Sequence, residues 1–390
     1  MRKLAKLSLV AAVAVAGLTN VNAASLEEAI KGVDVSGQFR FRAQDQSNIV
    51  GGTVAKASDR VKQNSTDVEI EVGVKVPVTE NITAVFKIDN APNNGNSEPT
   101  TDALDIEDYY FSYNQGALTV NAGQQNIPGR ITDGAQGDGI VALYNLGNFT
   151  VGAAAFNNHT AGTDGNAAGY TLSSTDGSNT IYTAVPAVAG NADKDVLSVI
   201  AMGTVGPVSL LAQYADVADT ADTYNLKADA SIEMVKVGAE YTETGMDANN
   251  DDLSTVKAYA SAKVGIVSAK LSYAATGDEG SGSLHSNAGG AAAGLETPAE
   301  ALLWNIGTSG RADYDAFTID ASVAVTPAIS LRAAYLAGEQ GTGTNNEVTE
   351  TLGQISYKVS KNLNTYVRFA DVEDQGKEFT RGRVEARYSF

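Results

Sequence analysis

Apolar and polar residues alternate along most of this chain with a period of two. In one early segment, Val68, Ile70 and Val72 are separated by Glu69 and Glu71. Successive side chains of a β-strand point to opposite faces, whereas an α-helix repeats about every 3.6 residues. The pattern therefore predicts strands that each have one apolar face and one polar face.

The same alternation continues to the end of the chain and predicts eighteen strands. Most are close to the length of a tilted membrane-spanning strand, roughly 9–11 residues. An even number of strands is typical of a closed single-chain bacterial barrel. The expected strands are 33–43, 67–77, 81–90, 104–114, 116–124, 138–146, 148–157, 195–204, 206–217, 221–231, 233–243, 254–264, 266–276, 313–325, 327–338, 348–359, 361–373 and 380–390.

Short and long connections alternate between these strands, with 218–220 the one brief member of the long set. Most long connections are rich in Gly, Asn, Asp, Ser and Thr, above all 158–194 and 277–312. Outer-membrane barrels have short periplasmic turns and long extracellular loops, while a soluble β-sandwich has no reason to sort its loops by length. We therefore expect an all-β protein, a transmembrane antiparallel β-barrel of about 18 strands with short periplasmic turns and long extracellular loops.

The first 23 residues have the features of an export signal. Arg2, Lys3 and Lys6 precede an apolar run over 7–18, and Val21-Asn22-Ala23 offers small residues at a cleavage site. An apolar run this short does not span a bilayer as a helix, which needs about 20 residues. We expect a signal peptide over 1–23, a porin domain over 24–390, and a location in the outer membrane of a Gram-negative bacterium.

Charge and composition narrow the functional classes further. Removal of residues 1–23 leaves 24 Lys and Arg against 46 Asp and Glu, a formal charge of −22. Such acidity argues against binding to nucleic acid, which needs basic surfaces. The chain has no cysteine, so disulfides and thiolate metal sites are excluded.

The polar strand faces are expected to line the pore. Eighteen strands enclose a space too wide for side chains to fill, so the lumen holds water and the apolar face meets lipid. The last strand carries arginines on its polar face, and closure of the barrel places it beside the first strand. Together with neighbouring strands this predicts a basic pore wall of Arg40, Arg42, Arg332, Arg368, Arg381, Arg383 and Arg387. Basic and acidic walls facing each other favour the passage of small hydrophilic solutes.

Other functional classes find less support. Serine hydrolases need a base, usually histidine, and His159 and His285 both lie in Gly- and Asn-rich loops. We therefore expect no enzymatic activity. A surface adhesin or receptor barrel, or a substrate-specific channel, stays open as an alternative. The apolar Leu302-Leu303-Trp304 holds the single tryptophan and suits packing in the pore mouth, a subunit contact or an adhesive patch.

Several segments resemble one known family. They are 25–31, 33–37 and 40–42 at the mature N-terminus, 122–125, 132–135 and 138–139 in the middle, and Arg383 to Phe390 at the C-terminus. These motifs are similar to those of the Campylobacter-type major outer membrane proteins, a family of outer-membrane porins.

The resemblance implies a general diffusion porin that prefers cations and assembles as a homotrimer among outer-membrane lipid and lipopolysaccharide. It implies that the third long loop, 125–137, folds into the lumen with Arg130 and Asp133, and that the barrel assembly machinery reads Phe390. It requires no cofactor, but it also implies that Ca²⁺ can bind in the pore. Asp138 matches the acid of the constriction-loop motif, and Asp164 and Glu300 are assigned by their position in the long loops alone.

Overall fold

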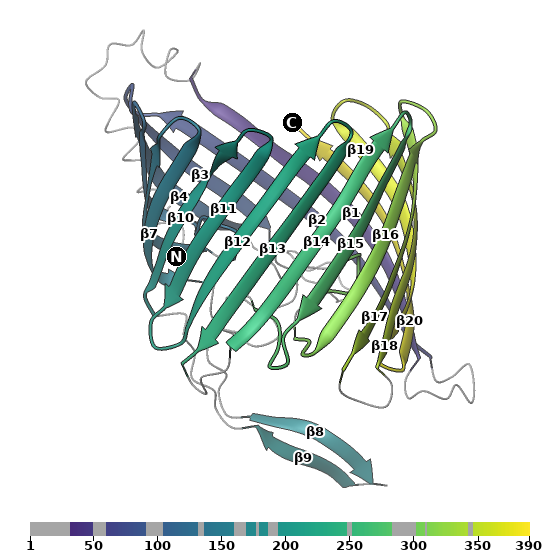
Figure 1. The fold of residues 1–390 in the computed structure, drawn as a ribbon. Helices are drawn as coiled ribbons and strands as arrows, with labels where there is room; N and C mark the ends of the chain where they lie inside the picture. Colours follow the sequence, from purple (N-terminus) through teal and green to yellow (C-terminus); the bar gives the residue numbers. More distant parts are fainter. Residues whose placement is uncertain are drawn as a thin grey trace.

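The computed structural model describes residues 32–49, 60–90, 104–131, 136–159, 169–176, 179–185, 194–247, 252–282, 302–308, 310–341 and 346–390. Eighteen of its strands form one antiparallel sheet that closes as a barrel (Figure 1). They are β1 (Asp34–Ile49), β2 (Arg60–Pro77), β3 (Ile82–Asn90), β4 (Leu104–Gln115), β5 (Leu118–Asn126), β6 (Gln136–Asn145), β7 (Phe149–His159), β10 (Val196–Val205), β11 (Val208–Val217), β12 (Ala221–Ile232), β13 (Val235–Met246), β14 (Asp252–Val264), β15 (Val267–Thr276), β16 (Tyr314–Ala324), β17 (Ile329–Gln340), β18 (Glu347–Lys358), β19 (Leu363–Asp374) and β20 (Lys377–Ser389). Among these residues there is no helix with the length and apolar character that crossing a membrane would require.

The barrel closes between its first and last strands. Strands pair in chain order from β1 to β7, then β7 pairs with β10, and the order continues to β20. β20 returns to β1 in an antiparallel register that runs from Gln38 opposite Ser389 to Asn48 opposite Phe379. A ring of this kind has no unpaired strand edge, which is the condition for a sheet to cross lipid.

All eighteen expected strands are present, so the predicted barrel is confirmed. The largest differences are in β1 and β2, which continue well into 44–66, where a loop was expected. The expected long connection 158–194 joins β7 to β10. This segment contains β8 (Gly169–Asp176) and β9 (Asn179–Val185), which pair as a separate antiparallel hairpin.

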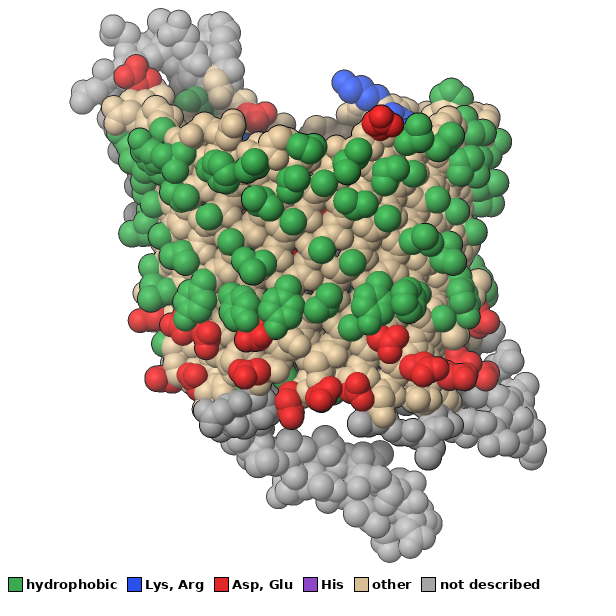
Figure 2. Space-filling model, viewed as in Figure 1, with side chains coloured by type: hydrophobic (Ala, Val, Ile, Leu, Met, Phe, Trp, Pro, Cys, Tyr) green, Lys and Arg blue, Asp and Glu red, His purple; other side chains and the backbone are tan. Residues whose placement is uncertain are grey.

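Apolar side chains cover the outside of the barrel (Figure 2). Phe41, Leu226 and Phe317 lie in strand interiors and are nevertheless 45%, 53% and 61% exposed. Their strand neighbours Asn225 and Thr318, which point to the opposite face, are buried. This inside-out distribution is stable when lipid surrounds the barrel, because the apolar surface then avoids water.

Outward-facing aromatic residues mark both borders of the apolar band. Toward the short turns, Phe111, Tyr388 and Phe390 are exposed. Toward the opposite end, here named the loop end, Tyr214, Tyr335 and Phe369 are exposed. Acidic side chains lie beyond this second border, as Figure 2 shows. Amphipathic aromatic rings prefer the level of the lipid headgroups, so the two borders define the height of the membrane-spanning part.

The short turns depend on left-handed backbone conformations. Gly116, Gly206 and Gly265 adopt φ values of 60°, 58° and 60°, whereas Glu233 supplies a φ of 53° in the turn between β12 and β13. Tight hairpins need positive φ because it matches the twist of the paired strands, and glycine adopts it without strain. The glycines that punctuate the sequence pattern therefore set where the chain reverses.

The last residue is part of the sheet. The backbone N–H of Phe390 donates to the carbonyl of Gly37 at 3.0 Å, and the N–H of Gly37 donates back to Phe390 at 3.1 Å. The ring of Phe390 lies 5.8 Å from that of Phe39, centroid to centroid. A β-carbon at Gly37 would approach the Cζ atom of Phe390 to 2.8 Å. Glycine at this position therefore makes room for the C-terminal ring.

We predict that Leu226→Arg lowers the free energy of unfolding from lipid by about 2–4 kcal/mol, because it places a charge in the middle of the apolar band. Met234→Arg is the matched control. Met234 is also exposed but lies in a short turn, where the same charge costs about 0–1 kcal/mol. Urea titration of protein refolded in liposomes measures both values, and equal losses would contradict the assigned membrane level.

Candidate functional site

Three adjacent strands carry a group of arginines on the inner face of the barrel. The backbone register places Arg368 of β19 opposite Arg383 of β20, and Arg387 of β20 opposite Arg40 of β1. Like charges that face each other across strands are unfavourable, so each needs compensation. This arginine cluster consists of Arg40, Arg42, Arg368, Arg381, Arg383 and Arg387.

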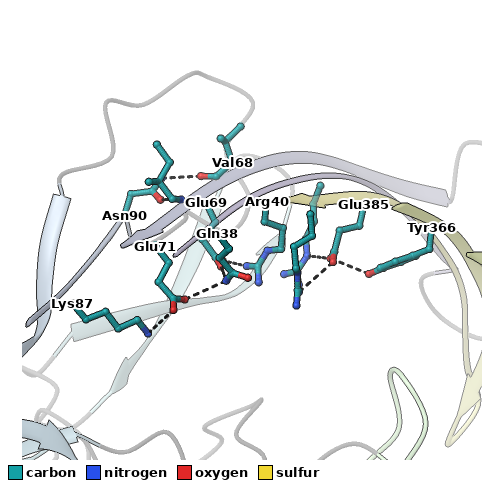
Figure 3. Close-up of polar contacts among 12 residues, drawn as sticks. Gln38, Arg40, Val68, Glu69, Glu71, Lys87, Asn90, Tyr366 and Glu385 are labelled. Atoms are coloured by element: carbon teal, nitrogen blue, oxygen red, sulfur yellow. Dashed lines mark hydrogen bonds and ion pairs between the residues drawn. The ribbon is translucent and has the colours of Figure 1, made fainter. Parts of the chain in front are cut away.

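The half of the cluster nearer the short turns is compensated by carboxylates. Buried Glu385 accepts Arg42 Nε at 2.6 Å and Arg387 Nη2 at 3.2 Å. The hydroxyl of Tyr366 donates to the same carboxylate at 3.0 Å. Arg40 forms an ion pair with Glu69. Figure 3 shows Arg40, Glu69 and Glu385 projecting from the same face of the sheet. Three positive charges are thus held by two negative charges.

The half nearer the loop end has neutral partners. Arg368 Nε donates to the amide oxygen of Gln354 at 2.7 Å. Arg383 Nη2 donates to Gln44 Oε1 at 2.6 Å, and Arg381 Nη2 donates to the same oxygen at 3.0 Å. In the described part of the chain, no carboxylate lies within ion-pair distance of these three arginines. Amide oxygens accept hydrogen bonds from all three, Arg381 Nε has no partner among the described residues, and no ion pair compensates their positive charge.

A recess of about 440 Å³ opens beside the cluster on the inner face. Four arginines and one carboxylate contribute most of its wall, which gives it an excess of positive charge. It is lined by Arg42, Asn364, Tyr366, Arg368, Arg383, Glu385 and Arg387. Guanidinium groups present planar, fixed donors, so such a recess can hold carboxylate or phosphate oxygens.

Trp304 lies over the uncompensated half of the cluster. The guanidinium carbons of Arg368 and Arg381 are each 5.0 Å from the centroid of its ring, and that of Arg383 is 5.1 Å away. A cation within about 6 Å of an indole face is attracted by the ring quadrupole. One side chain of the segment 302–308 therefore contacts three cations that lie on two neighbouring strands.

A buried carboxylate holds this segment inside the barrel. Glu350 of β18 is 0% exposed. It accepts backbone N–H groups of Trp304 at 3.2 Å, Asn305 at 2.9 Å and Ile306 at 3.1 Å. The side-chain amide of Asn305 donates to the same carboxylate at 2.8 Å. Hydrogen bonds to a carboxylate are stronger than those between neutral groups, so the conformation of the segment is well determined.

Apolar packing adds to this anchor. Ile306 joins a buried cluster on the inner side of the loop end, with Leu302, Leu303 and Trp304 packed against it. The other buried members are Tyr314, Ala316, Leu336, Val348, Ala370 and Val372. Of the three roles open to Leu302-Leu303-Trp304, packing inside the pore mouth is the one that these contacts support.

The described part of the third long loop also folds inward. Arg130 Nε lies 3.0 Å from Glu240 Oε1 of β13, and its backbone N–H donates to Gln213 of β11 at 2.6 Å. Ile127 and Ile131 pack in a buried cluster with residues of β6, β7, β10 and β11. The loop thus crosses from β5 to the facing part of the wall.

Acidic residues gather beside the arginine cluster on β2, β3 and β4. Lys87 Nζ lies 2.7 Å from Glu107 and 3.4 Å from Glu71, and Asp89 is opposite Glu71 in the register. Gln38 donates to Glu69 and Glu71, which connects the two groups (Figure 3). Arginines are therefore concentrated on β1, β19 and β20 and carboxylates on β2, β3 and β4, while each group also contains ion-paired side chains of the opposite charge.

The structure places the remaining predicted site residues as follows. Arg332 of β17 pairs with Asp320 at 2.6 Å and lies two strands from Arg368, with Gln354 between them in the register. Asp133, Asp164 and Glu300 lie outside the described residues. Asp138 shares its face of β6 with the exposed Ile140, and no metal-binding group of three or more ligands occurs among the described residues. One carboxylate cannot supply the roughly six to eight oxygens that Ca²⁺ takes, so calcium binding stays a prediction.

Sequence reasoning did not single out Glu350 or Gln44 as site residues. Glu350 is the fourth residue of its strand, between Val348 and Leu352 on the buried face. A carboxylate between apolar residues of one face was the available signal. Gln44 lay beyond the expected end of the first strand, because β1 is longer than its apolar alternation.

The closed barrel, its apolar outside, its charged inner wall and its inward-folded loops together define an outer-membrane porin. The chain belongs to the Campylobacter major outer membrane protein family, whose model matches residues 2–388. None of the curated proteins compared with it matches.

Solved structures of Pseudomonas aeruginosa outer-membrane proteins share the fold. OpdK has a TM-score of 0.64 at 13% identity, with 92% of this chain and 98% of that chain covered. OccK3 (OpdO) has a TM-score of 0.66 at 12% identity, with coverage of 94% and 97%. OccK11 (OpdR) has a TM-score of 0.67 at 10% identity, with coverage of 92% and 96%. At such identities the likeness concerns the fold alone.

We predict that Glu350→Ala exposes the single tryptophan to water. The substitution removes three hydrogen bonds from backbone N–H groups to a carboxylate, each worth about 1.5–3 kcal/mol, and frees the segment that carries Trp304. The emission maximum of Trp304 should move to longer wavelength, and quenching by acrylamide should increase. Glu347→Ala removes an exposed carboxylate of the same strand and should leave both unchanged; a similar shift in both variants would contradict the anchor.

Proposed function

We propose that this porin is a general diffusion channel for small hydrophilic solutes and ions. The observation that supports it most directly is a barrel of eighteen strands whose inner face carries charged side chains rather than an apolar core. A ring of this size leaves room for water in the lumen. Charged side chains along the wall favour polar solutes over apolar ones.

We further propose that the channel prefers cations. Exposed carboxylates surround the loop end, where permeating ions enter; they include Asp195, Asp219, Asp252, Asp278, Glu279, Asp313, Asp315, Glu339, Glu347 and Asp371. Of the few cations described there, Lys194 pairs with Asp219 and Arg311 pairs with Asp374. A negative entrance concentrates cations and depletes anions.

A substrate-specific channel is the second candidate, and the arginine-lined recess favours it. One solved OpdK structure contains vanillate, an observation about that protein. If this chain were specific for a small organic anion, millimolar vanillate would reduce its current in KCl, whereas a general diffusion channel would conduct as before. The reading as an adhesin or receptor would require a barrel that carries no current.

Export and assembly complete the proposal. We propose that residues 1–23 are removed after export, that Phe390 directs assembly of the barrel, and that three copies associate. The hydrogen bonds between Phe390 and Gly37 support the second point, because they make the C-terminal residue part of the closing strand pair. Passive diffusion through the proposed channel requires no cofactor.

We predict that replacing Arg383 and Arg387 together by Ser raises cation selectivity. Two positive charges leave the inner wall, so anions lose attraction and cations lose repulsion. Planar bilayers with a KCl gradient measure the reversal potential, which should move toward the potassium equilibrium potential. Lys361→Ser, in an exposed short turn, is the control and should have no effect. An unchanged reversal potential in the double variant would remove both arginines from the conduction path.

A further inference from the structure

We propose that Trp304 is a determinant of charge selectivity, because its indole ring covers an anion-binding surface that Arg368, Arg381 and Arg383 would otherwise present to the lumen. This inference rests on the proposed channel function and adds to it a specific residue that limits the passage of anions. It is carried by four observations on the described residues.

The first observation is the position of the ring. Its centroid is 5.0 to 5.1 Å from the guanidinium carbons of all three arginines. At such a point the attractions of the three cations for a small anion add. The indole therefore occupies the volume in which a carboxylate, phosphate or chloride would bind.

The second observation is that these arginines have no carboxylate within ion-pair distance in the described part of the chain. Gln354, Gln44 and Asn305 accept their hydrogen bonds through amide oxygens. Amides satisfy the donors but carry no net charge. The other half of the cluster differs, because Glu69 and Glu385 pair with its arginines.

The third observation is that the cover is fixed. Glu350 binds the backbone of Trp304 and of the two residues that follow it. Asn305 connects the two sides of the contact, since its amide nitrogen donates to Glu350 and its oxygen accepts Arg381. An aromatic ring held in this way stays over the guanidinium groups without a bound ligand.

The fourth observation concerns the recess beside the ring. Arg368 and Arg383 belong both to the covered group and to the lining of the recess of about 440 Å³. Removal of the indole would join the covered surface to this recess. Three uncompensated cations and the arginines beyond them would then form one continuous basic surface.

The simpler alternative is that Trp304 only packs the loop segment against the barrel. Leu303 provides the comparison, because it packs against the same apolar cluster and has no ring to place over a cation. Loss of packing affects Leu303→Ala and Trp304→Ala alike. Only Trp304→Ala also removes the aromatic ring that covers the three arginines.

The test is the reversal potential of purified, refolded protein in planar bilayers under a tenfold KCl gradient. We expect Trp304→Ala to lower the potassium-to-chloride permeability ratio about twofold or more, because chloride gains access to the three arginines. Trp304→Phe keeps an aromatic face and should retain most of the ratio of the unmodified protein. Leu303→Ala should retain it fully. Heat-modifiable mobility on electrophoresis checks that each variant is folded.

A double variant connects the effect to the arginines. Adding Arg383→Gln to Trp304→Ala should restore at least half of the lost ratio, because one of the uncovered charges is gone. The inference is overturned if Trp304→Ala conducts with an unchanged ratio, or if Leu303→Ala lowers the ratio as much. If the unmodified protein carries no current, the proposed function fails instead, and the two failures are distinguishable.

Discussion

Every backbone N–H and C=O group that crosses the lipid must find its partner within the protein, because the hydrocarbon offers none. In this chain the constraint is met by a ring of antiparallel strands that β20 and β1 complete. The hydrogen bonds between Phe390 and Gly37 extend that closure to the last residue. The apolar outside follows from the same condition, since the outer side chains replace the contact with water by contact with lipid.

Closure of so many strands also leaves an interior that is too wide for side chains to fill. Charged side chains can stay inside because water reaches them, but closely spaced charges of one sign still need compensation. The wall uses carboxylates for Arg40, Arg42 and Arg387, and amides together with one indole ring for the other three arginines. The inward loop segments therefore affect the charge balance of the wall as well as the width of the pore.

The two loop anchors use the same chemistry. A carboxylate on the inner wall, Glu350 or Glu240, receives several donors from a segment that enters the lumen. Each anchor also has an apolar cluster at the loop end of the barrel. Buried carboxylates are stable there because charge-assisted hydrogen bonds replace their hydration. The apolar clusters limit water at the same places.

Strand alternation by itself determined the class of fold, the number of membrane strands and which face of each strand is apolar, because a period of two is a local property of the chain. It also identified the arginines of β1, β19 and β20 as neighbours, since closure brings the first and last strands together. It missed β8 and β9, which pair with each other and not with the barrel sheet. Only the tertiary structure decided that Glu350 holds Trp304 over Arg368, Arg381 and Arg383. Those partners are far apart in the sequence, and their contact depends on strand register and on the path of a loop, neither of which leaves a local pattern.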